Sequence, residues 1–164
     1  MRNIVLIGMP GCGKSTIGRK LATAMHRQFF DVDEEIVRLT GQSIKELFAV
    51  GEEHFRTKET EATKLLAQKT DVVISCGGGV VKRDENMEAL RATGTVFLLH
   101  RSPEDICKEV DVATRPLLTE GRDKIFQLYK ERIKLYVQAA DYIVDVQEPF
   151  GKTIPKIMNF LKKH

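Results

Sequence analysis

The segment from Gly8 to Ser15 constrains the fold of this chain more than any other part of the sequence. It reads Gly-Met-Pro-Gly-Cys-Gly-Lys-Ser and matches the pattern G-x-x-x-x-G-K-[ST] at every specified position. The apolar run Ile4 to Ile7 precedes it and a helical pattern follows, which is the setting in which such a loop binds phosphates. Lys14 would then reach the β and γ phosphates, and the Ser15 hydroxyl would be a magnesium ligand. The alternative is a glycine-rich turn that caps an ordinary helix, but the complete match favours nucleotide binding.

The rest of the chain predicts a parallel sheet, because apolar runs of strand length alternate with helical patterns. The predicted strands are Ile4 to Ile7, Gln28 to Val32, Val72 to Ser75, Thr95 to His100 and Asp141 to Val146. The predicted helices are Lys14 to Met25, Ser43 to Val50, Glu52 to Gln68, Asp84 to Ala92, Pro103 to Val110, Asp123 to Ala139 and Pro149 to Lys162. We therefore expect an α/β fold of three layers, with a five-stranded parallel sheet flanked by helices.

Length and composition exclude several classes of protein. A chain of 164 residues is expected to form a single domain, residues 1–164. Its 26 basic and 23 acidic residues are mixed along the chain, which argues against nucleic acid as a partner. Cys12, Cys76 and Cys107 form no metal-binding or disulfide pattern. No apolar run is long enough to span a bilayer, so we expect a cytoplasmic protein without a membrane partner, and a monomer.

Two carboxylates, Asp31 and Asp33, stand at the end of the second predicted strand. Alternation along a strand would point both to the same side. Because the carboxyl ends of strands border the ligand crevice in open α/β sheets, both would lie near the magnesium ion and the acceptor. One would hold metal-bound water and the other a substrate hydroxyl. The alternative is that Asp33 caps a helical stretch that begins at Glu34.

Two arginines fall on or beside apolar helical faces. Glu59 lies on the stripe of Phe55, Ala62 and Leu66, and Arg56 precedes it by three residues. This spacing favours an arginine that Glu59 holds for an anionic substrate, although an exposed ion pair is the alternative.

The second arginine, Arg132, falls on the apolar stripe of a later helix. That stripe consists of Ile125, Leu128, Tyr129 and Tyr136. An inward guanidinium needs an anion, which is either a ligand or a structural carboxylate.

Two further segments are candidates for ligand contacts. Gly77 to Gly79 follow the third strand, where three glycines let the backbone approach a ligand, unless they form a plain turn. The stretch from Asp111 to Arg122 lacks periodicity, and we expect a mobile lid there. Arg115 within it would swing onto the transferring phosphate, the alternative being a solvated loop arginine.

Taken together, these motifs resemble the shikimate kinase family from Ile4 to about Phe160. The matching pieces are Gly8 to Thr16, Asp31 to Asp33, Ser43 to Phe48, Gly51 to Glu59, Gly77 to Val81, Arg115 to Leu118, and Arg132 with Tyr136. The resemblance implies a P-loop kinase that transfers the γ-phosphoryl group of ATP to the 3-hydroxyl of shikimate, on the route to chorismate, with one Mg²⁺ ion. The alternatives are another P-loop small-molecule kinase, such as a gluconate kinase, and a non-catalytic ATP-binding module.

The resemblance also implies roles for individual residues. The ATP-binding residues would be Gly11, Cys12, Gly13, Lys14, Ser15, Thr16 and Arg115. The residues that contact shikimate would be Asp33, Arg56, Gly78 and Arg132, with both arginines on its carboxylate and residues 33–60 forming the acceptor-binding helices. The catalytic residues would be Lys14, Asp33 and Arg115, and the magnesium ligands would be Ser15 and Asp31.

Some positions depart from the family's usual pattern. Lys108 stands where the family often places an arginine on the adenine face, and Pro149 is a weaker candidate for the opposite face. Cys12 and Cys76 replace small aliphatic or hydroxyl residues, and Cys76 beside the glycines would carry an exposed thiol. Asp33 is expected to orient the hydroxyl with an unperturbed pKa of about 3.9.

Overall fold

Five parallel strands form the centre of the structure, a computed structural model that describes residues 2–113, 118–147 and 149–163. The strands are β1 (Asn3–Ile7), β2 (Gln28–Asp31), β3 (Val72–Ser75), β4 (Gly94–His100) and β5 (Tyr142–Asp145). They follow the order β2-β3-β1-β4-β5, and every neighbouring pair is parallel. The predicted α/β fold with a five-stranded parallel sheet is therefore confirmed.

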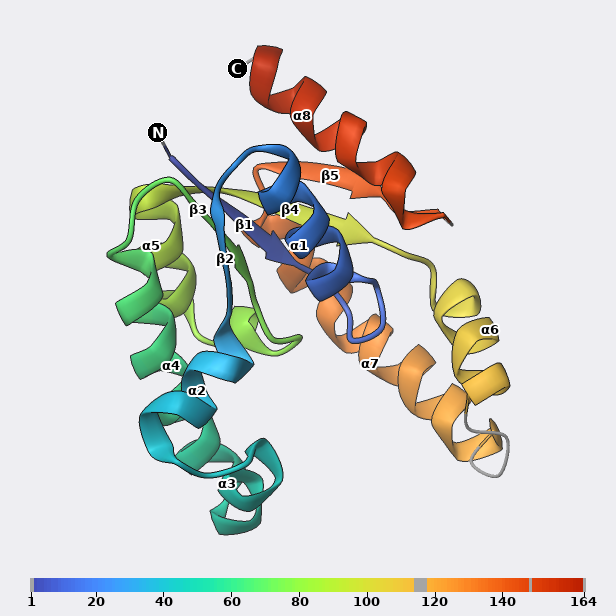
Figure 1. Ribbon diagram of the computed structural model, residues 1–164. Coiled ribbons are helices and arrows are strands. Elements are labelled where there is room, and N and C mark those ends of the chain that lie inside the picture. The colour runs from blue at the N-terminus through green and yellow to red at the C-terminus, as the bar shows by residue number, and fades with distance from the viewer. Residues whose placement is uncertain (1, 114–117, 148, 164) are drawn as a thin grey trace.

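The helices cover both faces of the sheet, as Figure 1 shows. They are α1 (Lys14–Ala24), α2 (Val32–Thr40), α3 (Ile44–Val50), α4 (Glu52–Ala67), α5 (Asp84–Thr93), α6 (Pro103–Ala113), α7 (Leu118–Ala139) and α8 (Thr153–Lys163). Short 3-10 helices, η1 (Val80–Lys82) and η3 (Phe150–Lys152), complete the described elements. None of the described helices combines the length and the apolar character that a bilayer span requires.

The side chains of β1 point alternately to the two faces of the sheet, so the core has one part on each face. The sheet and the helices on its two faces form the three layers. Val5 and Ile7 point to one face, where they join a cluster with residues of α4, α5 and α7. Ile4 and Leu6 point to the other face and pack with residues of α1 and α8. All four side chains are fully buried, as expected for the central strand of a parallel sheet.

The prediction for the end of β2 was wrong in one respect. The strand ends at Asp31, and α2, which was absent from the predicted helices, begins at Val32. Asp31 caps this helix, because its Oδ1 accepts hydrogen bonds from the N–H groups of Asp33 (2.8 Å) and Glu34 (3.3 Å). Strand alternation therefore does not orient the two aspartates, and Asp33 is not the cap.

The stretch from Asp111 to Arg122 is also more regular than predicted. Helix α6 continues to Ala113, and α7 begins at Leu118. Residues 114–117, which include Arg115, lie outside the described part of the chain. The predicted helix from Pro149 to Lys162 divides into η3 and α8, which begins only at Thr153.

Candidate functional site

A cavity of about 370 Å³ opens at the carboxyl edge of the sheet, where β1, β2 and β3 end side by side. Because the strands are parallel, the loops that follow them meet at this edge. The lining residues come from the phosphate loop, the start of α2 and the turn after β3. They are Pro10, Gly11, Gly13, Lys14, Ser15, Thr16, Asp31, Asp33, Ser75, Cys76, Gly77 and Gly78.

The phosphate loop connects β1 to α1 with three glycines at positive φ angles, Gly8 at +149°, Gly11 at +84° and Gly13 at +93°. L side chains rarely adopt such angles, which explains why glycines occupy these positions. Lys14, nearly buried at 9% exposed, donates from Nζ to the carbonyl oxygens of Gly8 (2.8 Å) and Met9 (2.9 Å). The ammonium group is thereby held against the loop that would enclose the phosphates.

The predicted magnesium ligands are in direct contact with each other. The Ser15 hydroxyl donates to Asp31 Oδ2 at 2.9 Å, and both residues line the cavity. Among the described residues there is no cluster of three or more His, Cys, Asp or Glu side chains that could hold a metal ion. One carboxylate and one hydroxyl fit Mg²⁺, which takes few protein ligands and completes its shell with water and phosphate oxygens.

Asp33 lies two residues further along, in the first turn of α2, and it also lines the cavity. Burial raises its pKa from 3.8 to about 6. The carboxylates of Asp31 and Glu59 add to the rise, while the cations Lys14 and Arg56 oppose it. The expectation of an unperturbed pKa was therefore wrong, because the sequence showed neither the burial of Asp33 nor the carboxylates that lie near it.

Arg56 and Glu59 form a buried ion pair on α4. Nη1 of Arg56 lies 3.0 Å from Glu59 Oε1, and the two residues are 6% and 1% exposed. The alternative of an exposed ion pair was wrong. Burial raises the pKa of Glu59, and the charges of Arg56 and Arg132 oppose that rise. Arg56 Nε is a buried donor without a hydrogen-bond partner, with Glu52 Oε2 3.7 Å away.

The glycines after β3 are packed against the side chains of the site. A Cβ atom on Gly77 would lie 3.1 Å from Glu59 Oε2 and 3.2 Å from Asp33 Oδ1. A Cβ atom on Gly79 would overlap the guanidinium group of Arg56. The sequence predicted close approach of a ligand to this turn; the structure shows that its own charged groups already approach the backbone closely.

Arg132 reaches the same turn from α7. Its Nη1 lies 3.2 Å from the position that a Cβ of Gly78 would occupy. Arg132 is half-buried, and it forms no ion pair with any carboxylate in the described part of the chain. Near it, the Tyr136 hydroxyl donates to the Gly78 carbonyl at 2.6 Å. The structural carboxylate that was the alternative partner of Arg132 is thus not found there.

Comparison with known proteins decides the family. The family model for shikimate kinase matches residues 10–162. The chain belongs to the shikimate kinase family. A shikimate kinase from Clostridium beijerinckii is 44% identical over 158 residues, which cover 96% of this chain and 94% of that protein. One from Clostridium botulinum (strain Alaska E43 / Type E3) is 46% identical over 162 residues, covering 98% of each.

Solved structures agree with this assignment to the shikimate kinase family. The shikimate kinase from Acinetobacter baumannii in complex with shikimate superposes with a TM-score of 0.90 and 33% identity, covering 99% of this chain and 94% of that chain. A gluconokinase from Sinorhizobium meliloti shares the fold at a TM-score of 0.66, but only 16% of its sequence. The comparisons therefore favour the shikimate kinase assignment over the gluconate kinase alternative.

Other predictions for this shikimate kinase family member have mixed outcomes. Cys76 is 3% exposed and burial raises its pKa, so the expectation of an exposed thiol was wrong. Cys12 is fully buried. The Lys108 side chain is 80% exposed and lies 3.7 Å from Asp105, so adenine contact stays a prediction.

One part of the site was not identified as such from the sequence. From the sequence, Tyr136 was placed on an apolar stripe and among the pieces that match the family but was given no role, yet its hydroxyl supports the glycine turn, and burial raises its pKa to about 12. A polar tip on an apolar stripe was the available signal, because buried tyrosine hydroxyls usually find an acceptor.

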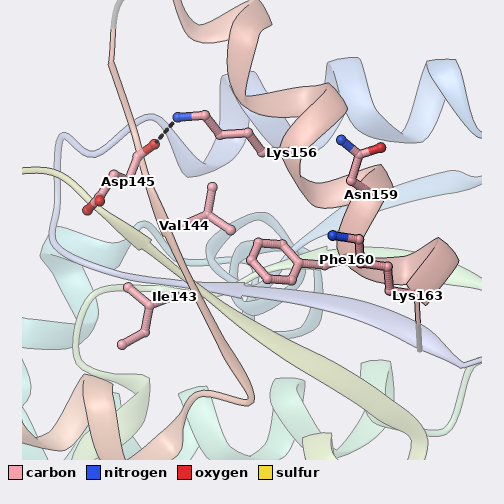
Figure 2. A pocket seen from close by; sticks show the side chains of 7 residues that line it. All are labelled: Ile143, Val144, Asp145, Lys156, Asn159, Phe160 and Lys163. Carbon is pink, nitrogen blue, oxygen red and sulfur yellow. Dashed lines mark hydrogen bonds between the residues drawn. The ribbon is translucent and has the colours of Figure 1, made fainter.

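A second cavity, of about 340 Å³, lies between the edge strand β5 and α8 (Figure 2). Val144 and Phe160 supply apolar surface, and Lys156 Nζ donates to the Asp145 carbonyl at 3.3 Å. It shares no lining residue with the cavity at the phosphate loop. The candidate active site is therefore the cavity at the carboxyl edge.

Proposed function

We propose that this chain transfers the γ-phosphoryl group of ATP to the 3-hydroxyl of shikimate, giving shikimate 3-phosphate and ADP. The observation that carries the proposal is that Asp33, which lines the cavity, feels the charges of two cations from different parts of the site. Lys14 lines the cavity from the phosphate loop, Arg56 packs against Gly79 of the glycine turn, and the charge of each lowers the pKa of Asp33. A nucleotide phosphate and an anionic acceptor would thus meet at one carboxylate.

On the nucleotide side, the loop from Gly11 to Thr16 would bind the phosphates through its N–H groups and Lys14. Ser15 and Asp31 would hold a magnesium ion, which supplies charge neutralisation of the phosphate oxygens. The family assigns Arg115 to the phosphoryl group, and that role stays a proposal because this residue lies outside the described part of the chain.

On the acceptor side, Arg56 and Arg132 would bind the carboxylate of shikimate, and the glycine turn at Gly78 would lie against it. The buried Nε of Arg56 makes no hydrogen bond, its ion pair with Glu52 being 3.7 Å long, and a buried donor without a hydrogen bond costs roughly 1 to 3 kcal/mol, which supports this assignment. Glu59 would hold the Arg56 guanidinium in place against the glycine turn.

The chemical step needs orientation and a proton acceptor more than a strong base. The acceptor hydroxyl oxygen would form a bond to the γ-phosphorus while the bond to the β,γ-bridging oxygen breaks, and its proton would pass to Asp33. Because the pKa of Asp33 is about 6, the carboxylate is mostly ionised at pH 7 and is a better acceptor than an ordinary aspartate. Lys14 would stabilise the charge on the transferring group and on ADP.

Coupled measurement of ADP release tests this function. Shikimate, gluconate and AMP are offered separately with ATP and Mg²⁺, and we expect shikimate alone to accelerate ADP release. Faster turnover with gluconate would assign the chain to the alternative kinase class. ATP binding without acceptor-dependent release would indicate a non-catalytic module. Sedimentation of the same sample tests the monomer that we also propose.

A further inference from the structure

The phosphate loop is contacted by residues that are not among those lining the cavity. Side chains from the segments after β4 and β5 pack against it. Arg101 follows β4 directly, Ile106 lies in α6, and Phe150 begins η3. A Cβ atom on Gly11 would lie 3.2 Å from Ile106 Cγ2, and one on Gly13 would lie 3.2 Å from the ring of Phe150.

Arg101 contacts the backbone of the loop. It is 6% exposed, and its Nη1 donates to the Gly11 carbonyl at 2.9 Å. The N–H on the other side of the same peptide bond, that of Cys12, donates to the Met9 carbonyl at 3.1 Å. Both polar groups of the Gly11–Cys12 peptide are therefore bonded within the protein, which sets the orientation of that peptide plane.

Arg101 also contacts the aromatic ring that touches the loop. Its guanidinium carbon lies 5.2 Å from the centroid of Phe150, within the range of a cation–π interaction. The ring in turn packs against Gly13, the residue at φ +93° that precedes Lys14. The Arg101 side chain thus contacts both the Gly11 carbonyl and the Phe150 ring that packs on Gly13.

We propose that Arg101 and Phe150 are positioning residues for the nucleotide, which hold the phosphate loop in its binding shape from outside. The inference rests on the proposed ATP binding and adds two residues that are not among those lining the cavity at the phosphate loop. Three glycines give the loop backbone wide conformational freedom, so contacts from neighbouring elements add to the hydrogen bonds of Lys14 in setting its shape. Without these contacts the loop would adopt several conformations. Only the fraction in the binding conformation could bind the nucleotide, which lowers the apparent affinity.

The test measures nucleotide binding and acceptor kinetics separately. Arg101→Met keeps the length and apolar stem of the side chain but removes the donor. We expect ADP affinity by calorimetry to fall about tenfold or more, the scale of one charge-assisted hydrogen bond, and the KM for ATP to rise in parallel. The KM for shikimate should change less than about twofold, and Arg101→Lys should recover part of the ADP affinity.

A matched control is Arg91→Met. Arg91 also donates to a backbone carbonyl, that of Gln138 at 2.8 Å, but outside the nucleotide site, so ADP affinity should stay at the wild-type value. If Arg101→Met does not fold, Phe150→Leu retains apolar packing without the ring and should still weaken ADP binding. Unchanged ADP affinity in a folded variant, or equal loss for ADP and shikimate, would overturn the inference. Failure of the wild type to bind ADP would instead overturn the proposed function.

Discussion

The carboxylates of Asp33 and Glu59 converge on one glycine: both have an oxygen within 3.2 Å of the position that a Cβ of Gly77 would occupy. Burial and the nearby charge of Glu59 raise the pKa of Asp33, and burial raises the pKa of Glu59. Arg56 offsets this cost for both, because its charge lowers the pKa of each carboxylate. The acid–base behaviour of the site therefore depends on a cluster and not on Asp33 alone.

The rate of phosphoryl transfer should depend on pH through Asp33. Its pKa of about 6 lies above the ordinary aspartate value of 3.8, so protonation removes the proton acceptor already in mildly acidic solution. We expect kcat/KM for shikimate to fall below about pH 6, with the slope of one proton. The measurement is a pH–rate profile at saturating ATP. A profile that stays flat down to about pH 4.5 would exclude Asp33 as the acceptor.

The same shift makes a prediction about folding stability. Between pH 3.8 and about 6 the folded state binds more protons at Asp33 than the unfolded state does, so the free energy of unfolding falls as pH rises. Asp33→Asn removes this loss. The free energy of unfolding of the variant, relative to that of wild type, should increase by roughly 1 to 3 kcal/mol from about pH 4 to pH 7. Urea unfolding of both proteins at both pH values measures this change. A difference in the free energy of unfolding that is the same at the two pH values would contradict the raised pKa.

Substitution of Arg56 and substitution of Arg132 should both weaken shikimate binding, but only the first should lower folding stability strongly. Arg56→Ala leaves Glu59 without its buried partner and should lower the free energy of unfolding by about 3 to 5 kcal/mol. Arg132→Ala, at a half-buried residue without an ion pair in the described part of the chain, should change it by less than about 1 kcal/mol. Both should weaken shikimate binding, by about 2 kcal/mol or more, and leave ADP binding unchanged. Wild-type shikimate affinity in Arg132→Ala would remove this residue from the site.

Gly79→Ala should reduce acceptor binding through Arg56. The added methyl group overlaps the guanidinium, so Arg56 must move from its present position. We expect the KM for shikimate to rise about tenfold, because one charge-assisted contact is misplaced. Gly151→Ala is the control, since nothing lies within 4 Å of its Cβ position. Equal kinetics in the two variants would show that the glycine turn tolerates a side chain.

Lys14→Met should lose turnover while the protein still folds. The substitution removes the hydrogen bonds from Nζ to Gly8 and Met9 and the charge facing the phosphates. We expect turnover to fall by at least about a hundredfold, the scale of one preorganised electrostatic group. Lys20→Met, an exposed lysine on the same helix, should be close to wild type. Comparable turnover in both variants would mean that the loop does not act on phosphate.

The sequence was sufficient for the parts of this protein that depend on local pattern. The phosphate loop, the parallel sheet and the inward position of Arg56 follow from motif spacing and from periodicity, because each is set by residues near one another in the chain. The predicted ends of helices and strands were less accurate where a capping side chain, and not the hydrophobic periodicity, sets the end. Asp31 ends β2 by capping α2, which neither a strand nor a helix period predicts.

Only the tertiary structure decided how these parts act on each other. The raised pKa of Asp33 comes from burial and from Asp31 and Glu59, and Glu59 lies on a different helix. Side chains from other elements crowd the glycine turn: Asp33 and Glu59 at Gly77, Pro10 and Arg132 at Gly78, and Arg56 at Gly79. The outer contact of Arg101 joins residues 90 positions apart in the sequence. Such effects depend on distances between groups far apart in the chain, and a sequence pattern does not contain those distances.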